Sequence, residues 1–296
     1  MNSKLIIILL IVALVLFVAH KIMSKFKMPK LGQMVFIDGG LKTGKSTVAV
    51  AFLNAKYKIA LHDWKFKCFL CEILQREKPE KPLIYSNIPL NIPHVPLTQD
   101  LILRKKRFRF GSVIYINEAS LLADSQLIKD SDLNAQLLLF SKLIGHELHA
   151  GHSCIILDSQ TVSDVHYSFK RSLAETYYIH HLVKWIPFFL IAYIREERYR
   201  EDGTVVNTYS NDVEDSLKKV IIKKSTWKLF DHCCHSTYTD NLPCEDNVVE
   251  VDNLKAKGIV SFRDWSKYII SDEEIVEDKK IEYNKLEYKN DEKKND

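Results

Sequence analysis

The sequence predicts an α/β fold with a mainly parallel sheet. Short apolar runs typical of buried strands occur at residues 34–37, 83–87, 113–116 and 154–158. Segments with helix-like spacing of apolar residues lie between them, at about residues 44–57, 61–76 and 134–149. Strands that alternate with helices usually pair in parallel. A glycine-rich turn joins the first of these strands to the first helix, and it is the strongest single indication of the fold.

The glycine-rich turn runs from Gly39 to Ser46 and matches the complete pattern G-x-x-x-x-G-K-[ST]. In that pattern, backbone N–H groups and the helix N-terminus surround the phosphates of a nucleotide. Lys45 is expected to reach the β- and γ-phosphates of ATP, and Ser46 to ligate Mg²⁺. The predicted nucleotide-binding residues are Gly39, Gly40, Leu41, Lys42, Thr43, Gly44, Lys45, Ser46 and Thr47. The alternative is a chance glycine-rich turn before a helix.

The strand at residues 113–116 ends in Asn117 and Glu118. A strand that ends in acidic residues downstream of a phosphate loop is typical of the Walker B arrangement, which places a carboxylate near Mg²⁺. Asn117 stands where aspartate is usual, so it can bind a metal-bound water but adds no charge. Glu118 is the candidate base that polarises the attacking water. The alternative is a strand that happens to end in a polar pair.

The strand at residues 154–158 is followed by Ser159, Gln160 and Thr161. We expect Gln160 to sense the γ-phosphate, because an amide can hold a water or a phosphate oxygen without adding charge. Beyond Thr176 the sequence becomes rich in β-type residues, with strands expected at 177–183 and 188–194 and a hairpin at 198–206 whose turn is Asp202-Gly203.

The N-terminus contains an unbroken apolar run from Leu5 to Ala19, which Ile22 and Met23 extend. We predict a membrane span at residues 5–23. Lysines are in excess after the run, so the N-terminus should lie outside and the rest of the chain in the cytoplasm. A cleaved signal peptide and a buried core helix are the alternatives, but no small-x-small cleavage site follows and the run has no polar face.

Composition sets limits on the remaining function classes. The 296 residues are 46% hydrophobic, enough for a sizeable core, and the net charge of +4 gives no overall basic field of the kind that nucleic-acid binding often requires. A basic cluster at residues 104–109 could meet phosphates, lipid or a partner, or be a solvated loop. Cys68 and Cys71 have metal-ligand spacing, with residues 232–235 as possible partners, although buried thiols are the simpler interpretation.

These motifs together resemble the zonula occludens toxin (Zot)-like family, which includes the assembly ATPases of filamentous phages. The resemblance covers roughly residues 33–243 and is carried by the following segments: the loop Gly39–Thr47, Tyr85–Pro89, Ile114–Ala119, His149–His152, Ile155–Gln160 and Trp227–Tyr238. Two features depart from the family pattern. Asn117 replaces the usual aspartate, and the apolar run precedes the ATPase segment, whereas the phage assembly members place their span after it.

The resemblance implies an additional-strand P-loop ATPase that acts at the bacterial inner membrane and powers virion assembly or export by DNA extrusion or packaging. The apolar run at residues 5–23 and the β-type sequence beyond Thr176 add a single N-terminal transmembrane helix and a β-rich C-terminal extension to this expectation. We divide the chain into an anchor (residues 1–27), an ATPase domain (28–245) and a charged tail (246–296). Motors of this kind usually form homo-oligomeric rings in which an arginine completes a neighbour's site, and we assign Arg171 to that role.

Expected ligands are ATP and Mg²⁺, and expected partners are phage coat and assembly proteins, with single-stranded DNA also possible. Two other functions remain open. The neutral Asn117 favours a membrane-bound scaffold that binds nucleotide with little or no hydrolysis. A nucleotide or small-molecule kinase would share the loop but need an arginine-rich lid, which the sequence does not show.

Overall fold

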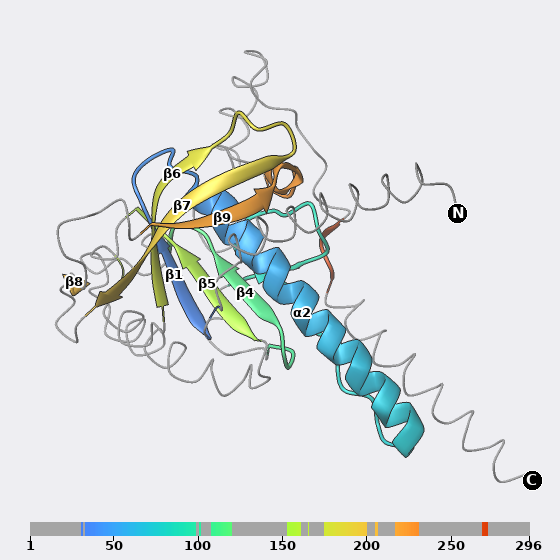
Figure 1. Ribbon diagram of the computed structural model, residues 1–296. Helices are drawn as coiled ribbons and strands as arrows, with labels where there is room; N and C mark the ends of the chain where they lie inside the picture. The colour runs from blue at the N-terminus through green and yellow to red at the C-terminus, as the bar shows by residue number, and fades with distance from the viewer. Residues whose placement is uncertain are drawn as a thin grey trace, which may run out of the picture.

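The computed structural model describes residues 31, 33–98, 101, 108–119, 153–160, 165, 175–199, 205–206, 217–230 and 268–271. These residues form one sheet and one long helix (Figure 1). The strands are β1 (Met34–Asp38), β2 (Ile84–Ser86), β3 (Val95–Pro96), β4 (Val113–Ile116), β5 (Cys154–Asp158), β6 (Glu175–Val183), β7 (Phe189–Tyr199), β8 (Val205–Val206) and β9 (Lys218–Lys223). The four strands expected from the apolar runs are therefore present, and the prediction of an α/β fold is confirmed.

The sheet order is β3-β2-β4-β5-β1-β6-β7-β8, with β9 also paired to β7. All pairs from β3 through β6 are parallel, and β7 pairs antiparallel with its three neighbours. Strand β5 therefore lies between β1, which leads into the glycine loop, and β4, which ends at Asn117. In parallel strands the carboxyl ends meet at one edge, so residues from three distant segments of the chain converge there.

Both faces of the central sheet are buried, because alternate side chains point to opposite faces. On β1, Val35 and Ile37 pack against the helix side, while Met34 and Phe36 belong to a second cluster on the other side. The same alternation holds in β4 and β5. Strands buried on both faces are continuous apolar runs in sequence, which is why the sequence revealed them.

The helix α2 (Lys45–Leu74) is one continuous helix of 30 residues, whereas the sequence suggested two helices that meet near residue 60. No glycine or proline interrupts residues 58–60, so the backbone hydrogen bonds continue through them. The helix ends at Gln75, which adopts a left-handed conformation (φ 53°), and Arg76 then donates its N–H to the Cys71 carbonyl. A left-handed residue with such a backward bond is a common helix stop.

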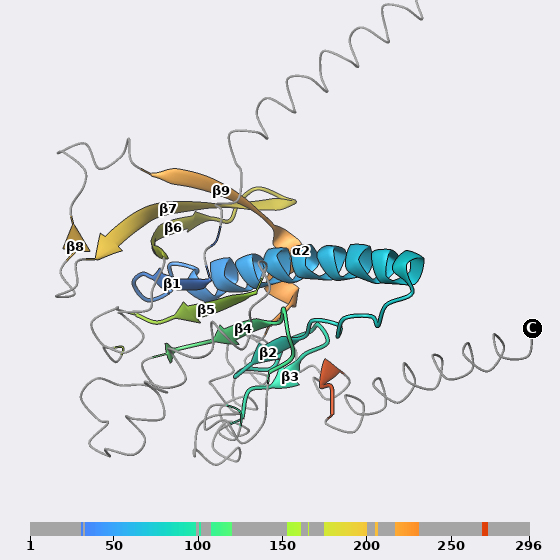
Figure 2. The same cartoon turned by 90° about the horizontal axis from the view of Figure 1, so that it is seen from below.

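The sheet curves around the first half of α2 (Figure 2). On one side α2 contacts β1, β4 and β5, and on another it contacts β9 and the 3₁₀ helix η2 (Lys224–Lys228). The predicted strands at 177–183 and 188–194 correspond to β6 and β7, and the pairing of Tyr199 with Val205 confirms a hairpin there. Strand β9 was not predicted, because its short apolar centre, residues 220–222, is flanked by two lysines on each side.

Several predictions fall outside the described residues. They concern the span at 5–23, the helix at 134–149, Arg171, the Asp202-Gly203 turn, and the domain boundaries near residues 27 and 245. Within the part of the chain that the structure describes, no helix is both long enough and apolar enough to cross a membrane.

Candidate functional site

The glycine loop lies where the sequence placed it, between the end of β1 and the start of α2. Gly44 is the residue before the first helical turn, with φ 97°, and no side chain caps this end of the helix. The first turn also carries no acidic residue. The first N–H groups of a helix have no partner within it, and they lie at the positive end of its dipole. This helix end is therefore suited to bind an anion such as a phosphate.

The loop is held in shape by contacts to one carbonyl. The Gly40 carbonyl accepts hydrogen bonds from the Thr43 hydroxyl at 2.8 Å and from the Lys45 ammonium at 3.3 Å. Lys45 is buried, with 7% of its surface exposed, so its charge is directed into the loop and away from bulk water. Lys42 adopts a left-handed conformation (φ 61°) and is exposed. The two loop lysines therefore differ, and only Lys45 lies at the base of the loop.

Strand β6 forms a wall behind the loop, and nothing in the sequence indicated this contact. A β-carbon added to Gly39 would lie 2.8 Å from the carbonyl oxygen of Ile179. A β-carbon added to Gly44 would lie 2.8 Å from the Leu182 side chain. Both glycines also have positive φ angles, 152° and 97°. The loop therefore needs glycine at these two positions for conformation and for space.

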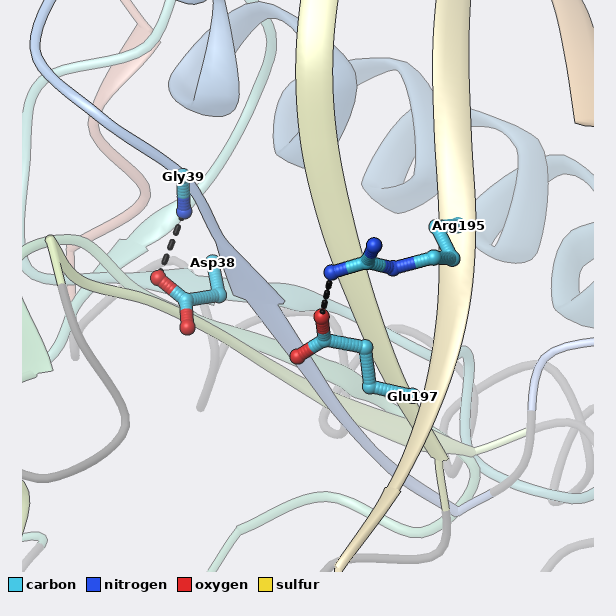
Figure 3. A network of polar contacts seen from close by, with 4 residues as sticks. All are labelled: Asp38, Gly39, Arg195 and Glu197. Atoms are coloured by element: carbon cyan, nitrogen blue, oxygen red, sulfur yellow. Dashed lines mark hydrogen bonds and ion pairs between the residues drawn. The ribbon is translucent and has the colours of Figure 1, made fainter. Parts of the chain in front are cut away.

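The start of the loop is fixed by Asp38, the last residue of β1 (Figure 3). Its carboxylate accepts a hydrogen bond of 2.6 Å from the Gly39 N–H. Figure 3 also shows Arg195 and Glu197 of β7, which form an ion pair of 2.5 Å. The Arg195 guanidinium lies 5.4 Å from the centre of the Tyr178 ring, and Tyr178 is the register partner of Asp38. The Arg195–Glu197 pair therefore lies beside β6, the strand that pairs with β1 at the start of the loop.

Asn117 lies next to the loop, as the Walker B interpretation requires. Its side-chain nitrogen Nδ2 is 3.3 Å from Ser46 Oγ, although the two residues are 71 positions apart in the chain. The same nitrogen donates to both carboxylate oxygens of Asp158, at 3.0 and 3.2 Å. An amide oxygen cannot donate to a carboxylate, so these contacts fix which way the Asn117 amide points. The structure thus brings together the predicted metal residues Ser46 and Asn117.

Asp158 is the residue of this site that the sequence did not reveal. It ends β5, has no exposed surface, and accepts hydrogen bonds from Tyr115 Oη (3.0 Å), Asn117 Nδ2 and the Glu118 N–H (2.8 Å). Burial raises the pKa of its carboxyl to about 6, and the charge of Glu118 contributes to the same shift. Burial and the nearby Asp158 also raise the pKa of Tyr115 well above its usual value. An aspartate that ends a continuous apolar run downstream of the phosphate loop was the sequence signal that could have found it.

Glu118 follows Asn117 in a left-handed conformation (φ 48°) and is partly exposed. Such a conformation is uncommon for a residue other than glycine and often occurs at functional sites. Here the Glu118 N–H bond to Asp158 holds it. Gln160 lies two residues beyond Asp158 at an exposed position. The predicted arginine, Arg171, lies outside the described residues, so the structure does not place it.

The side chain of Thr47 contacts the 3₁₀ helix η2. The hydroxyl is buried, and it accepts a hydrogen bond of 3.1 Å from Trp227 Nε1. This bond ties η2 to the first turn of α2. The side chain of Thr47 therefore stabilises the start of α2.

The Cys68–Cys71 pair lies on the distal half of α2, and both residues are partly buried thiols. Among the described residues, no group of three or more histidine, cysteine or acidic side chains is placed to hold a metal ion. The possible partners at residues 232–235 lie outside the described residues.

Comparisons with solved structures give partial overlaps. The N-terminal domain of zonular occludens toxin from Neisseria meningitidis aligns at 13% identity and a TM-score of 0.39, covering 68% of this chain and 100% of that one. The genome packaging NTPase B204 from Sulfolobus turreted icosahedral virus 2, in complex with ATP-gammaS, aligns at 11% identity and a TM-score of 0.27, covering 59% of this chain and 95% of that one. No known family model and no curated protein matches the sequence.

Proposed function

We propose that this protein is a membrane-anchored P-loop ATPase that powers filamentous phage assembly or export. The main support for the proposal is the geometry of the loop that connects β1 to α2. There an uncapped helix N-terminus, a buried Lys45 and two glycines with positive φ angles form a phosphate-binding loop. The polar ends of β4 and β5 lie beside it. This combination favours a nucleoside triphosphate bound with a divalent cation.

Each residue has a distinct task in this proposal. The N–H groups at the start of α2 bind phosphate oxygens, and Lys45 neutralises the charge on the β- and γ-phosphates. Ser46 provides a hydroxyl ligand for Mg²⁺, which when bound spreads the negative charge of the phosphates. Glu118 accepts the proton of the attacking water, and its partly exposed position leaves it open to solvent. Gln160 relays the presence of the γ-phosphate to the surface of the domain.

The strand order supports assignment to the additional-strand class of P-loop ATPases. That class has an extra strand between the loop strand and the strand that carries the catalytic acid. In this chain β5 occupies that place, since it pairs with β1 on one side and with β4 on the other. The β-rich extension of β6, β7 and β9 then closes around α2.

The biological role rests on the sequence motifs shared with the Zot-like family and on the apolar stretch at residues 5–23. We place the ATPase on the cytoplasmic side of the bacterial inner membrane, in a homo-oligomeric ring completed by Arg171. In this role it acts on phage coat and assembly proteins and on single-stranded DNA.

An ATPase assay on the full-length chain tests the proposal. Lys45→Ala should abolish magnesium-dependent ATP hydrolysis, and Glu118→Gln should lower its rate roughly 10²- to 10⁴-fold while ATP still binds. Lys58→Ala, which removes an exposed lysine of the same helix, is the matched control and should hydrolyse ATP at the wild-type rate. The proposal is wrong if wild-type hydrolysis does not depend on Lys45.

The neutral Asn117 supports a second candidate, a membrane-bound scaffold that changes shape with nucleotide but barely hydrolyses it. Saturable ATP binding that requires Lys45, with no turnover above the Lys45→Ala background, would identify the scaffold.

A further inference from the structure

The metal position of the proposed nucleotide site lacks a charge at its expected place. Mg²⁺ bound with phosphates prefers carboxylate and water ligands around it. Ser46 and Asn117, the two residues expected to serve the metal, are both neutral. The adjacent Glu118 is assigned to the attacking water, so any further carboxylate that serves the metal lies on another element.

Asp158 is placed to supply a negative charge to the metal position. Its register partner on β1 is Ile37, two residues before Gly39, and its strand also pairs with β4, where Leu157 faces Ile116. Neighbouring strands lie about 4.8 Å apart. Moving an acid from the end of β4 to the end of β5 therefore shifts the carboxylate by about one strand spacing toward the glycine loop.

The contacts of Asp158 link it to Ser46. Both carboxylate oxygens bind Asn117 Nδ2, and that nitrogen lies 3.3 Å from Ser46 Oγ. Asn117 is thus a bridge between the carboxylate and the hydroxyl. Because its amide nitrogen faces Asp158, Asn117 directs a donor toward the acid, which an aspartate at the same position could not do when ionised.

The burial of Asp158 indicates a role beyond packing. Removing a carboxylate from water is costly unless charges or hydrogen bonds compensate it. The partners found for Asp158 are neutral donors, and none of the ion pairs between described residues includes it. An apolar residue would complete the end of a buried strand at lower cost. A buried carboxylate beside a phosphate loop instead fits a cation.

We propose that Asp158 supplies the negative charge that holds the divalent cation of the bound nucleotide, in place of the neutral Asn117. The carboxylate acts on the cation through a metal-bound water or by orienting the Ser46 hydroxyl. The inference rests on the proposed function, because it requires a nucleotide in the loop. In P-loop proteins with the usual motif, the carboxylate that serves the metal ends the strand that corresponds to β4. Here we assign that carboxylate to the end of β5.

The test is the magnesium dependence of nucleotide binding, measured by calorimetry on the full-length chain with ATPγS, in Mg²⁺ or in EDTA. Wild type should bind more tightly with Mg²⁺. In EDTA, Asp158→Asn should bind ATPγS as tightly as wild type does. In Mg²⁺, its affinity for ATPγS should be roughly 10- to 100-fold lower than that of wild type. Asp63→Asn, which removes a carboxylate paired with Lys67 on the distal part of α2, is the control and should keep the full magnesium effect.

A charge swap separates a metal role from a structural one. The double variant Asn117→Asp/Asp158→Asn keeps one carboxylate and one amide in the same network, and it should restore the magnesium effect. If Asp158→Asn does not fold, the double variant alone decides, and its failure to show the effect overturns the inference.

Three further results would contradict the inference. It is overturned if Asp158→Asn keeps the full magnesium effect, or if wild type binds ATPγS equally in Mg²⁺ and EDTA. The proposed function survives both of these results. If wild type binds no ATPγS under either condition, the proposed function itself fails, and the inference fails with it.

Discussion

The side-chain amide of Asn87 pairs with the backbone of Asn117. Asn87 Nδ2 donates to the Asn117 carbonyl at 2.8 Å, and the Asn117 N–H donates to Asn87 Oδ1 at 2.7 Å. Asn87 follows β2, the strand that pairs with β4, and has no exposed surface. The turn that carries Asn117 and Glu118 is therefore positioned by a side chain from a neighbouring strand, and this suggests a first prediction.

Asn87→Ala should lower the free energy of unfolding by about 2–4 kcal/mol, because it leaves a buried N–H and a buried carbonyl of Asn117 without their partner. Urea unfolding followed by circular dichroism measures this. Asn91→Ala is the matched control, since Asn91 also donates to a backbone carbonyl, that of Lys228 at 2.9 Å, but at a partly exposed position. Its cost should be at most about 1 kcal/mol. Equal costs for the two variants would contradict the prediction.

The three glycines of the loop should respond differently to alanine. Gly39→Ala and Gly44→Ala should each lower stability by about 1–3 kcal/mol, because both positions have positive φ angles and no room for a β-carbon. Gly40→Ala should stay within about 0.5 kcal/mol of wild type, since its β-carbon would make only an ordinary contact of 3.7 Å with Thr43. Melting temperatures of the three variants check this, and a Gly40→Ala as unstable as Gly39→Ala would refute it.

The Trp227–Thr47 bond should stabilise the start of α2. Thr47→Val keeps the shape of the side chain but removes the acceptor, and it should cost about 1 kcal/mol or more because the indole N–H then lacks this partner. Thr47→Ser keeps the hydroxyl and is the control. Chemical denaturation with tryptophan emission as the signal measures both variants. The prediction fails if Thr47→Ser is the less stable of the two.

Cys154 should not react with thiol reagents in the folded protein. It lies in β5 with no exposed surface, and burial raises its pKa to about 12. In a variant whose other five cysteines are serine, labelling by a disulfide reagent at pH 8 should occur only at the rate of unfolding. Rapid labelling without denaturant would contradict the burial.

The same pKa shift has a consequence for stability. The folded pKa of Cys154 is higher than the unfolded value near 9, so the fold favours the neutral thiol. This contribution is fully present below about pH 9 and is lost as the pH rises toward 12. Cys154→Ala in the same background should therefore show a smaller loss of stability between these pH values.

Much of the fold could be predicted because its signals are local. The strands at 34–37, 113–116 and 154–158 are buried on both faces, so each is a continuous apolar run. The loop needs glycine at residues 39 and 44, so its pattern is visible in sequence. The prediction of two separate helices, at 44–57 and 61–76, was wrong. Residues 58–60 include no glycine or proline that would end a helix, so α2 continues through them.

The supporting residues could not be predicted, because their partners are distant in the chain. Ile179 and Leu182 of β6 set the space behind the loop, and Asn87 sets the turn at Asn117. Nothing about a single isoleucine or asparagine in a strand indicates such a contact. Strand β9 was missed for a related reason, since its lysine-rich sequence forms a strand only by pairing with β7.

The sequence by itself determined that a phosphate loop joins a strand to a helix and that Lys45, Ser46, Asn117 and Glu118 belong near it. These follow from backbone conformation and from the polarity of strand ends, which nearby residues fix. The tertiary structure decided that Asp158 is the carboxylate beside Ser46. That result depends on β5 pairing between β1 and β4, and strand order is set by packing between segments that lie 121 and 41 residues apart in the chain, which no local pattern encodes.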